Sequence, residues 1–258
     1  NATNYFLEQA GEKNPDSGSK VFGGSFGGPI VRNKGFWFAN IERTLTQEAA
    51  NLNFPANAAP LAVSYSDTTD FTVLNTFIRG DYQMTGNNHL SFRWVRESAL
   101  TEKDGLQGNE STPDNFTYEN DSGDQVLSFA WTSVIGGHMT NELRVGHVRE
   151  NLLQGPRIWF DDDWNFVGIN GREQFDFGSQ NTHPDYNAGP RTNYQQDLIR
   201  SYAIDDSFTY VKPDWGGDHT FKAGFGWSRN GAFPQSSGAN LIGTFNFSTN
   251  AAFDPANP

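Results

Sequence analysis

The chain has 258 residues, no cysteine and a formal net charge of −12 at pH 7. These values exclude disulfides and thiolate metal sites, and they argue against a nucleic acid partner, which requires a basic face. Hydrophobic residues make up 36% of the chain, aromatic residues 14%, and there are 27 glycines, so the composition favours β structure rich in turns. No apolar run approaches the roughly 18 residues of a transmembrane helix, but the alternating strands of a β-barrel would escape that measure.

The first predicted hairpin spans residues 22–42, FGGSFGGPIVRNKGFWFANIE, with VRNK as its turn. Glycines at 23, 24, 27 and 28 weaken a strand, so we expect another backbone or a plug to come close there. The run Phe36 to Phe38 is typical of a membrane interface. GGSFG also matches a nucleophile elbow, but a strand and Gly-Gly-Pro follow where a helix is required, so hydrolase chemistry at Ser25 is the weaker interpretation.

Residues 77–97 show the clearest two-residue alternation, with the turn TGNN between two predicted strands of about ten residues. Further hairpins are predicted at residues 125–150 and 198–229, with the turns GGHMTN and KPDWGGD. A last strand is expected at residues 242–248 and a weaker one near residues 70–75. In the hairpin of residues 77–97 the residues of one face are apolar or small: Ile78, Gly80, Tyr82, Met84, Leu90, Phe92 and Trp94. The residues of the other face are polar: Arg79, Asp81, Gln83, Ser91, Arg93 and Glu97.

The connections alternate between short turns within hairpins and long segments near residues 46–70, 100–123, 152–195 and 230–241. Short turns at one end and long loops at the other are the layout of an outer-membrane barrel. The sequence therefore predicts an all-β fold, an antiparallel transmembrane β-barrel segment of roughly eight to ten long strands. Residues 1–258 are expected to form part of one barrel domain.

Three stretches resemble TonB-dependent outer-membrane receptors, and among them the Oar-like group that often carries a carboxypeptidase-regulatory-like domain. They are residues 22–42, NYFLEQAG at residues 4–11, and HTFKAGFGWSRN at residues 219–230. The resemblance implies a location in the bacterial outer membrane and a barrel of about 22 strands closed by a plug. It also implies energisation through TonB, which contacts the plug. We expect the chain to be the early portion of such a barrel, without its plug or last strand.

The charged residues of the polar faces are expected to point into the lumen, where they would pair with each other or with the plug, because lipid-facing charges are penalised. Two loop tryptophans, Trp159 and Trp164, are further candidates for contact with an external ligand. The candidate lumen residues are Arg79, Asp81, Arg93, Glu97, Glu142, Arg144 and Lys222.

Asp161, Asp163 and Asn165 have the oxygen-ligand spacing of a calcium loop. Phe166 stands at the position of the required glycine and Arg172 at that of the bidentate glutamate, so the EF-hand match fails. A solvated acidic loop is the default, and weak binding of calcium or of a cationic ligand is the alternative. The histidines lack metal-ligand spacing, and no cofactor is predicted.

The expected function is TonB-dependent uptake, or binding at the cell surface, of a nutrient, with no enzymatic activity. The expected partners are outer-membrane lipid, the plug of the same protein, the TonB complex and an unidentified nutrient. The alternative is a soluble secreted β-sandwich or propeller that binds carbohydrate through its aromatic residues.

Overall fold

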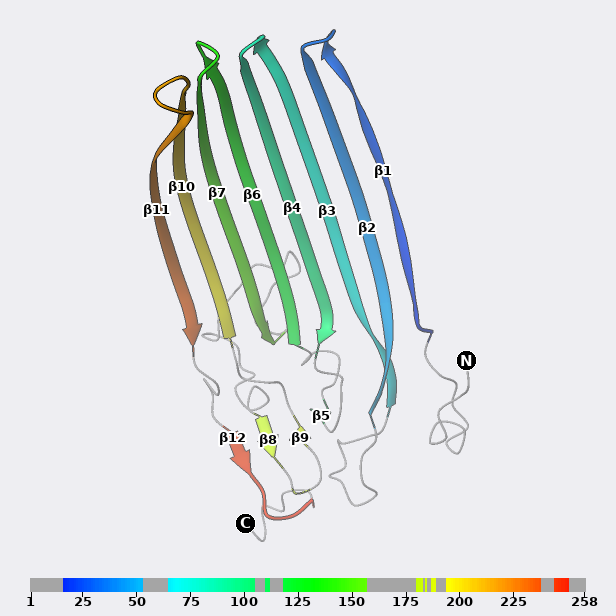
Figure 1. Ribbon diagram of the computed structural model, residues 1–258. Coiled ribbons are helices and arrows are strands. Elements are labelled where there is room, and N and C mark those ends of the chain that lie inside the picture. The colour runs from blue at the N-terminus through cyan, green and yellow to red at the C-terminus, as the bar shows by residue number, and fades with distance from the viewer. Residues whose placement is uncertain are drawn as a thin grey trace.

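The computed structural model describes residues 16–52, 65–104, 110–111, 118–156, 180–182, 184, 187–188, 194–237 and 244–250. Its main feature is one antiparallel sheet of eight strands in the order β1-β2-β3-β4-β6-β7-β10-β11 (Figure 1). The sheet is open, because β1 and β11 each pair with one neighbour. Its strands are β1 (Gly18–Val31), β2 (Gly35–Leu52), β3 (Tyr65–Thr85), β4 (Asn88–Asp104), β6 (Tyr118–Ile135), β7 (Met139–Pro156), β10 (Tyr194–Lys212) and β11 (His219–Ser237).

A second, four-stranded sheet lies beyond one end of the long strands (Figure 1). It consists of β5 (Glu110–Ser111), β8 (Gln180–Thr182), β9 (Asn187–Ala188) and β12 (Thr244–Asn246). The strand expected at residues 242–248 is therefore only three residues long, and it pairs in parallel with β8 instead of extending the main sheet. No helix in the described part of the chain is long and apolar enough to cross a membrane.

The four tight turns of the main sheet gather at one rim, as predicted (Figure 1). Gly136 and Gly137 have φ values of 61° and 74°, a left-handed conformation that favours glycine in the β6–β7 turn. Backbone hydrogen bonds join neighbouring hairpins at this rim. Lys34 O accepts from Gln83 N at 2.7 Å, and Asn87 O and His138 O accept from Val134 N and Val211 N at 2.8 Å. The turns are thus held in one continuous edge.

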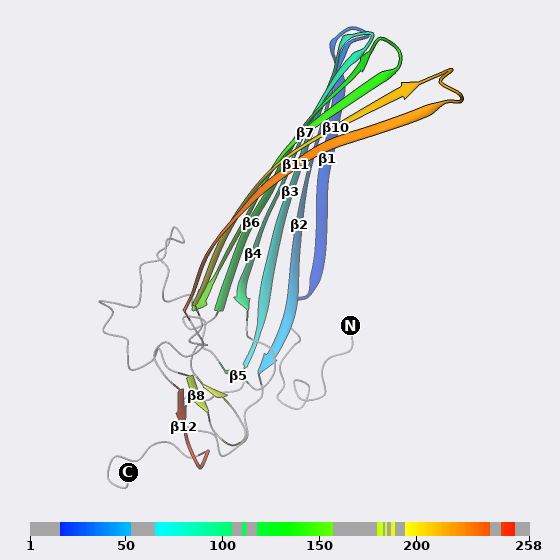
Figure 2. The same ribbon diagram turned by 60° about the vertical axis from the view of Figure 1, so that its left-hand side comes forward.

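The strands are longer than the roughly ten residues expected from alternation. They contain 14 to 21 residues, and the weak strand near residues 70–75 is part of the uninterrupted β3. Regular pairing continues into segments that were expected to be loops, as in the register from Gly35↔Tyr82 to Leu52↔Tyr65. At about 3.3 Å per residue, β3 extends for about 70 Å, which exceeds the path of a tilted strand across a bilayer. Figure 2 shows the bend and twist of the sheet along this length.

The two faces of the sheet differ in chemistry near the tight turns. Ile78 pairs with Trp94 and Gly80 with Phe92, and these rows continue to Leu127 and Phe129 on β6. We call this the apolar face, and the opposite one, with Arg79, the polar face. Further members of the apolar face are Trp37, Tyr82, Leu90, Trp131, Leu143, Val145, Tyr202, Ile204, Phe208, Phe221, Phe225 and Trp227.

The aromatic run of β2 is divided between the faces, which corrects the expectation that all three residues mark a membrane boundary. Trp37 pairs with Gly80 and lies on the apolar face, whereas Phe36 and Phe38 lie on the polar face, opposite Asp81 and Arg79. The Phe38 ring is 6.0 Å from that of Phe77. Adjacent residues of a strand point in opposite directions, so three consecutive aromatic residues cannot share a face.

The architecture does not match the soluble alternative. A β-sandwich buries one face of each sheet against a second sheet, and a propeller repeats four-stranded blades. Here the eight long strands form one layer, and large side chains of the apolar face remain exposed, among them Phe225 at 63% and Trp227 at 46%. An all-β, antiparallel fold with short turns at one end is confirmed.

One polar pair interrupts the apolar face. Asn141 Nδ2 donates to Asp206 Oδ1 at 2.8 Å, with Asp206 opposite Leu143 in the register. We expect Asn141→Leu to destabilise the sheet in a bilayer, because the carboxylate loses its donor, with a coupling between the two residues of about 1 kcal/mol. Urea unfolding of N141L, D206L and the double variant in liposomes measures that coupling. Additive effects of the two substitutions would contradict it.

Candidate functional site

The polar face of β3 and β4 carries a charged cluster near the tight turns. Arg79 Nε and Nη2 donate to Asp81 Oδ2 and Oδ1 at 2.6 and 2.9 Å, a bidentate pair between alternate residues of β3. His89 Nε2 lies 3.5 Å from Asp81 Oδ1, and its Nδ1 lies 3.3 Å from Gln83 Oε1. The charged residues were expected to pair with each other or with a plug, and Arg79 and Asp81 pair with each other.

Arg93 and Glu97 share this face but form no ion pair in the described part of the chain. Arg93 lies directly opposite Arg79, which places two like charges on neighbouring strands. Glu97 lies between Asn75 of β3 and Asp124 of β6. This part of the face therefore presents charges of both signs that the described residues leave uncompensated.

A second cluster lies on β7, β10 and β11. Arg144 Nε and Nη2 lie 2.9 and 2.7 Å from Glu142 Oε1, and Asp205 is the cross-strand neighbour of Arg144. These side chains line a cavity of about 340 Å³ together with Gly224 and Gly226. A Cβ at Gly226 would lie 3.0 Å from Asp205 Oδ1, so glycine provides the room for this carboxylate.

The predicted residues are thus divided between separate places on one face. Arg79, Asp81 and Arg93 lie on β3 and β4, and Glu142 and Arg144 lie on β7. Lys222 lies on β11, opposite Thr209, without an ion pair among the described residues. Trp159, Trp164, Asp161, Asp163 and Asn165 lie outside the described residues, so their predicted loop contacts stay predictions.

Sequence reasoning missed Asp205 and the two glycines of the recess. The alternation of β10 already put Asp205 on the face opposite Ile204, but the neighbouring Asp206 obscured the pattern by standing on the apolar face. The contribution of Gly224 and Gly226 follows from their pairing with Ser207 and Asp205, which depends on the length of the β10–β11 turn. Register was the missing information.

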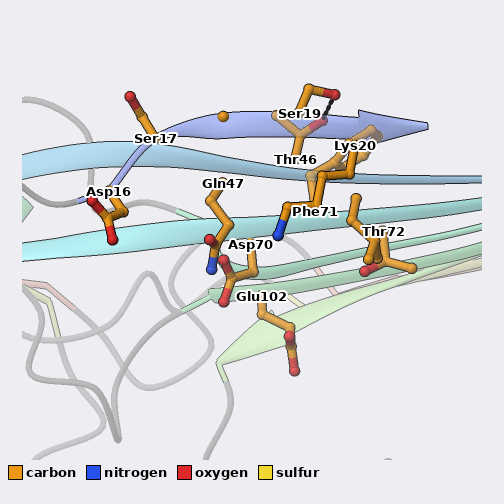
Figure 3. Close-up of a pocket in the computed structure, with 12 residues that line it drawn as sticks. Asp16, Ser17, Ser19, Lys20, Thr46, Gln47, Asp70, Phe71, Thr72 and Glu102 are labelled. Atoms are coloured by element: carbon orange, nitrogen blue, oxygen red, sulfur yellow. Dashed lines mark hydrogen bonds between the residues drawn. The ribbon is translucent and has the colours of Figure 1, made fainter. Parts of the chain in front are cut away.

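A larger cavity of about 500 Å³ lies where β1, β2 and β3 run toward the long connections (Figure 3). Gln47, Asp70 and Glu102 are successive cross-strand neighbours on one side of the sheet. On the other side the hydroxyls of Ser19 and Thr46 lie 3.0 Å apart. Asp70 Oδ1 is buried and has no hydrogen-bond partner among the described residues. None of the predicted site residues lines this cavity.

Long antiparallel strands, an exposed apolar face and a charged opposite face define the wall of a transmembrane β-barrel, in which lipid-facing and lumen-facing residues alternate. A family model of the outer membrane beta barrel domain matches residues 1–67 and 50–257. The chain belongs to this family of bacterial outer-membrane barrel domains. No curated protein and no solved structure matches it. The apolar face is therefore the outer, lipid-facing surface, and the polar face lines the lumen.

Proposed function

We propose that this wall belongs to a receptor that takes up a nutrient, or binds it at the cell surface, in a TonB-dependent manner. The observation that carries the proposal is the lumen face, which combines the charged recess of Glu142, Arg144 and Asp205 with the cluster around Asp81. A specific receptor needs placed polar groups on a rigid scaffold, and these groups stand on strands that pair with their neighbours along their length.

 The register between β7 and β10 is unbroken from Gln195↔Gln154 to Tyr210↔Met139. It keeps Glu142 and Arg144 of β7 and Asp205 of β10 at fixed positions relative to one another.

The open edges of the sheet favour a wide barrel. A strand edge in lipid leaves backbone groups without partners, so β1 and β11 each require another strand beside them. Since these two do not pair with each other, closure requires strands in addition to the eight described here. Barrels of about 22 strands have a lumen wide enough for a plug. Arg93, Glu97 and Lys222 form no ion pair with the residues that the structure describes, and the plug of the same protein, the element that TonB contacts, would compensate their charges.

The proposed receptor binds and transports without covalent chemistry. Ser25 lies in the middle of β1, paired with Asn40, so the strand–turn–helix geometry of a nucleophile elbow is not formed there. Ligand contacts by Trp159 and Trp164, and weak calcium binding by Asp161, Asp163 and Asn165, remain part of the proposal for the outer loops. Outer-membrane lipid is the partner of the apolar face.

Solute depletion from the growth medium tests this function. We expect wild-type cells to remove at least one nutrient that a strain lacking the gene leaves in the medium, and that a strain with inactive TonB also leaves. Cells that produce an Arg144→Gln variant at wild-type levels test the recess, and we expect a higher half-saturating nutrient concentration there. Identical depletion by wild-type and deletion strains would contradict the receptor function, and depletion without TonB would contradict the energised mechanism.

A further inference from the structure

The outer face carries a group of arginines at the end of the apolar band that is remote from the tight turns. Register places them on the same side as Trp37, Ile78 and Ile204. We call them the outer arginines: Arg43, Arg96, Arg149, Arg200 and Arg229.

The acidic residues beside them in the sequence do not neutralise these arginines. Adjacent residues of a strand point to opposite faces, so each acid that neighbours an outer arginine lies on the lumen side. None of the outer arginines forms an ion pair in the described part of the chain. The pairs divided in this way between the two faces are Glu42 with Arg43, Glu97 with Arg96, and Glu150 with Arg149.

The arrangement is most concentrated on β7, β10 and β11. Arg149 and Arg200 are direct cross-strand neighbours, which places their Cβ atoms about 5 Å apart. Gly231 lies opposite Arg200 on the other side, and Arg229 is two residues from that glycine on the same face. Like charges directly opposite each other destabilise a sheet unless an anion lies between them. The register thus places three arginines side by side on neighbouring strands, and no acidic residue of the described strands is their neighbour on this face.

The height of the group on the barrel identifies its surroundings. Arg149 is ten residues beyond Met139, the first residue of β7, and Arg229 is ten residues beyond His219, the first of β11. Ten residues of a strand tilted by about 40° rise about 25 Å, which is the height of the apolar band of an outer-membrane barrel. The outer arginines thus lie where hydrocarbon gives way to lipid headgroups, on the side of the long connections.

We propose that Arg149, Arg200 and Arg229 bind the phosphate groups of a lipid headgroup in the leaflet on the side of the long connections. Arginine forks bind phosphate oxygens in bidentate fashion, and a phosphate removes the repulsion between Arg149 and Arg200. The acyl chains of the same lipid lie against the apolar face, beside Tyr202 and Trp227, which are the next outward-facing residues toward the tight turns. The site is separate from the lumen and from the ligand proposed to bind there.

Binding of diphosphorylated lipid A to the purified protein in detergent tests this site, with bound lipid measured by native mass spectrometry. We expect the double variant R149Q/R200Q to bind at least tenfold more weakly than the wild type. Lys212→Gln is the matched control, because Lys212 lies on the same face of β10 at the opposite, tight-turn end. It removes one positive charge and is expected to leave binding unchanged. The R149K/R200K variant keeps the charge and should bind with intermediate affinity.

Two further measurements separate the sources of phosphate. Dephosphorylated lipid A should bind no better to the wild type than to R149Q/R200Q, and equal binding of both lipids to the wild type would overturn the proposal. Inorganic phosphate is added at the same concentration as the phosphate groups of lipid A. If it displaced the lipid, the assignment of the site to a lipid would be overturned. Only folded variants are compared. A folded barrel is recognised because the unboiled protein migrates differently on a gel from the boiled protein.

Discussion

Replacing Phe129 by arginine should destabilise the protein in a bilayer by about 2–4 kcal/mol, because the charge would stand in the middle of the lipid-facing band. Phe129 lies on the apolar face between Phe92 and Val145 and is 37% exposed. The loss of its apolar contact with lipid adds to the effect. Urea unfolding in liposomes measures the stability, and the amount of folded protein in the outer membrane should decrease in parallel.

Thr132→Arg is the matched control on the same strand. Thr132 lies on the lumen face, with His89 on one neighbouring strand and Glu142 on the other, so an arginine there reaches water and a carboxylate. We expect a change of less than about 1 kcal/mol. If both variants were destabilised equally, the assignment of the two faces would be wrong. If T132R alone failed to assemble, the faces would be exchanged.

The two faces were predictable from the sequence because alternation is a local property. Ile78 and Arg79 had to point in opposite directions in any strand, whatever its partner. The same reasoning, applied strictly, would have separated Phe36 and Phe38 from Trp37. The lengths of the strands were less accessible, since pairing between β2 and β3 continues through Ala49 and Thr68, where the sequence no longer alternates between apolar and polar residues.

The composition of the candidate site required the register between strands. Arg79 and Asp81 are two residues apart on one strand, so their pairing follows from sequence spacing. Asp205 joins Arg144 only because of the way in which β7 and β10 are aligned, although 61 positions separate them in the chain, and the long connection between these strands gives no signal for that alignment. The alternation within each strand likewise assigns a charged residue to the outer or the lumen face. It does not show which charged residues of different strands lie at the same height on the barrel.

The glycines of β1 were expected to mark a close approach of another backbone or of a plug, and the structure separates them into two kinds. A Cβ at Gly23 would collide with the Ile41 carbonyl oxygen and lie 2.9 Å from Glu42 Cα. A Cβ at Gly27 would lie 2.9 Å from the Trp37 carbonyl oxygen. The backbone that comes close to this pair is that of the neighbouring strand β2. At Gly28 no atom of the described residues, its two chain neighbours aside, lies within 4 Å of the added Cβ, and at Gly24 the nearest is a ring atom of Phe26 at 3.7 Å.

Alanine at positions 23 and 27 should therefore weaken the β1–β2 hairpin. Each added methyl group has to displace backbone, which costs about 1–3 kcal/mol per site in a packed environment. We expect G23A/G27A to unfold at a lower urea concentration than the wild type in liposomes, and to become sensitive to protease at β1 first, since β1 has only one neighbour in the described sheet.

The matched variant G24A/G28A changes the alternate pair of the same strand, on the outer face. Neither glycine has a positive φ, and the space around each accepts a methyl group, so a smaller entropy of the unfolded chain should leave stability unchanged or raise it by about 0.4–1 kcal/mol per site. If both double variants were destabilised equally, contact with the β2 backbone would not be the reason for glycine at positions 23 and 27. A destabilised G24A/G28A beside an unaffected G23A/G27A would instead place the close neighbour on the outer surface.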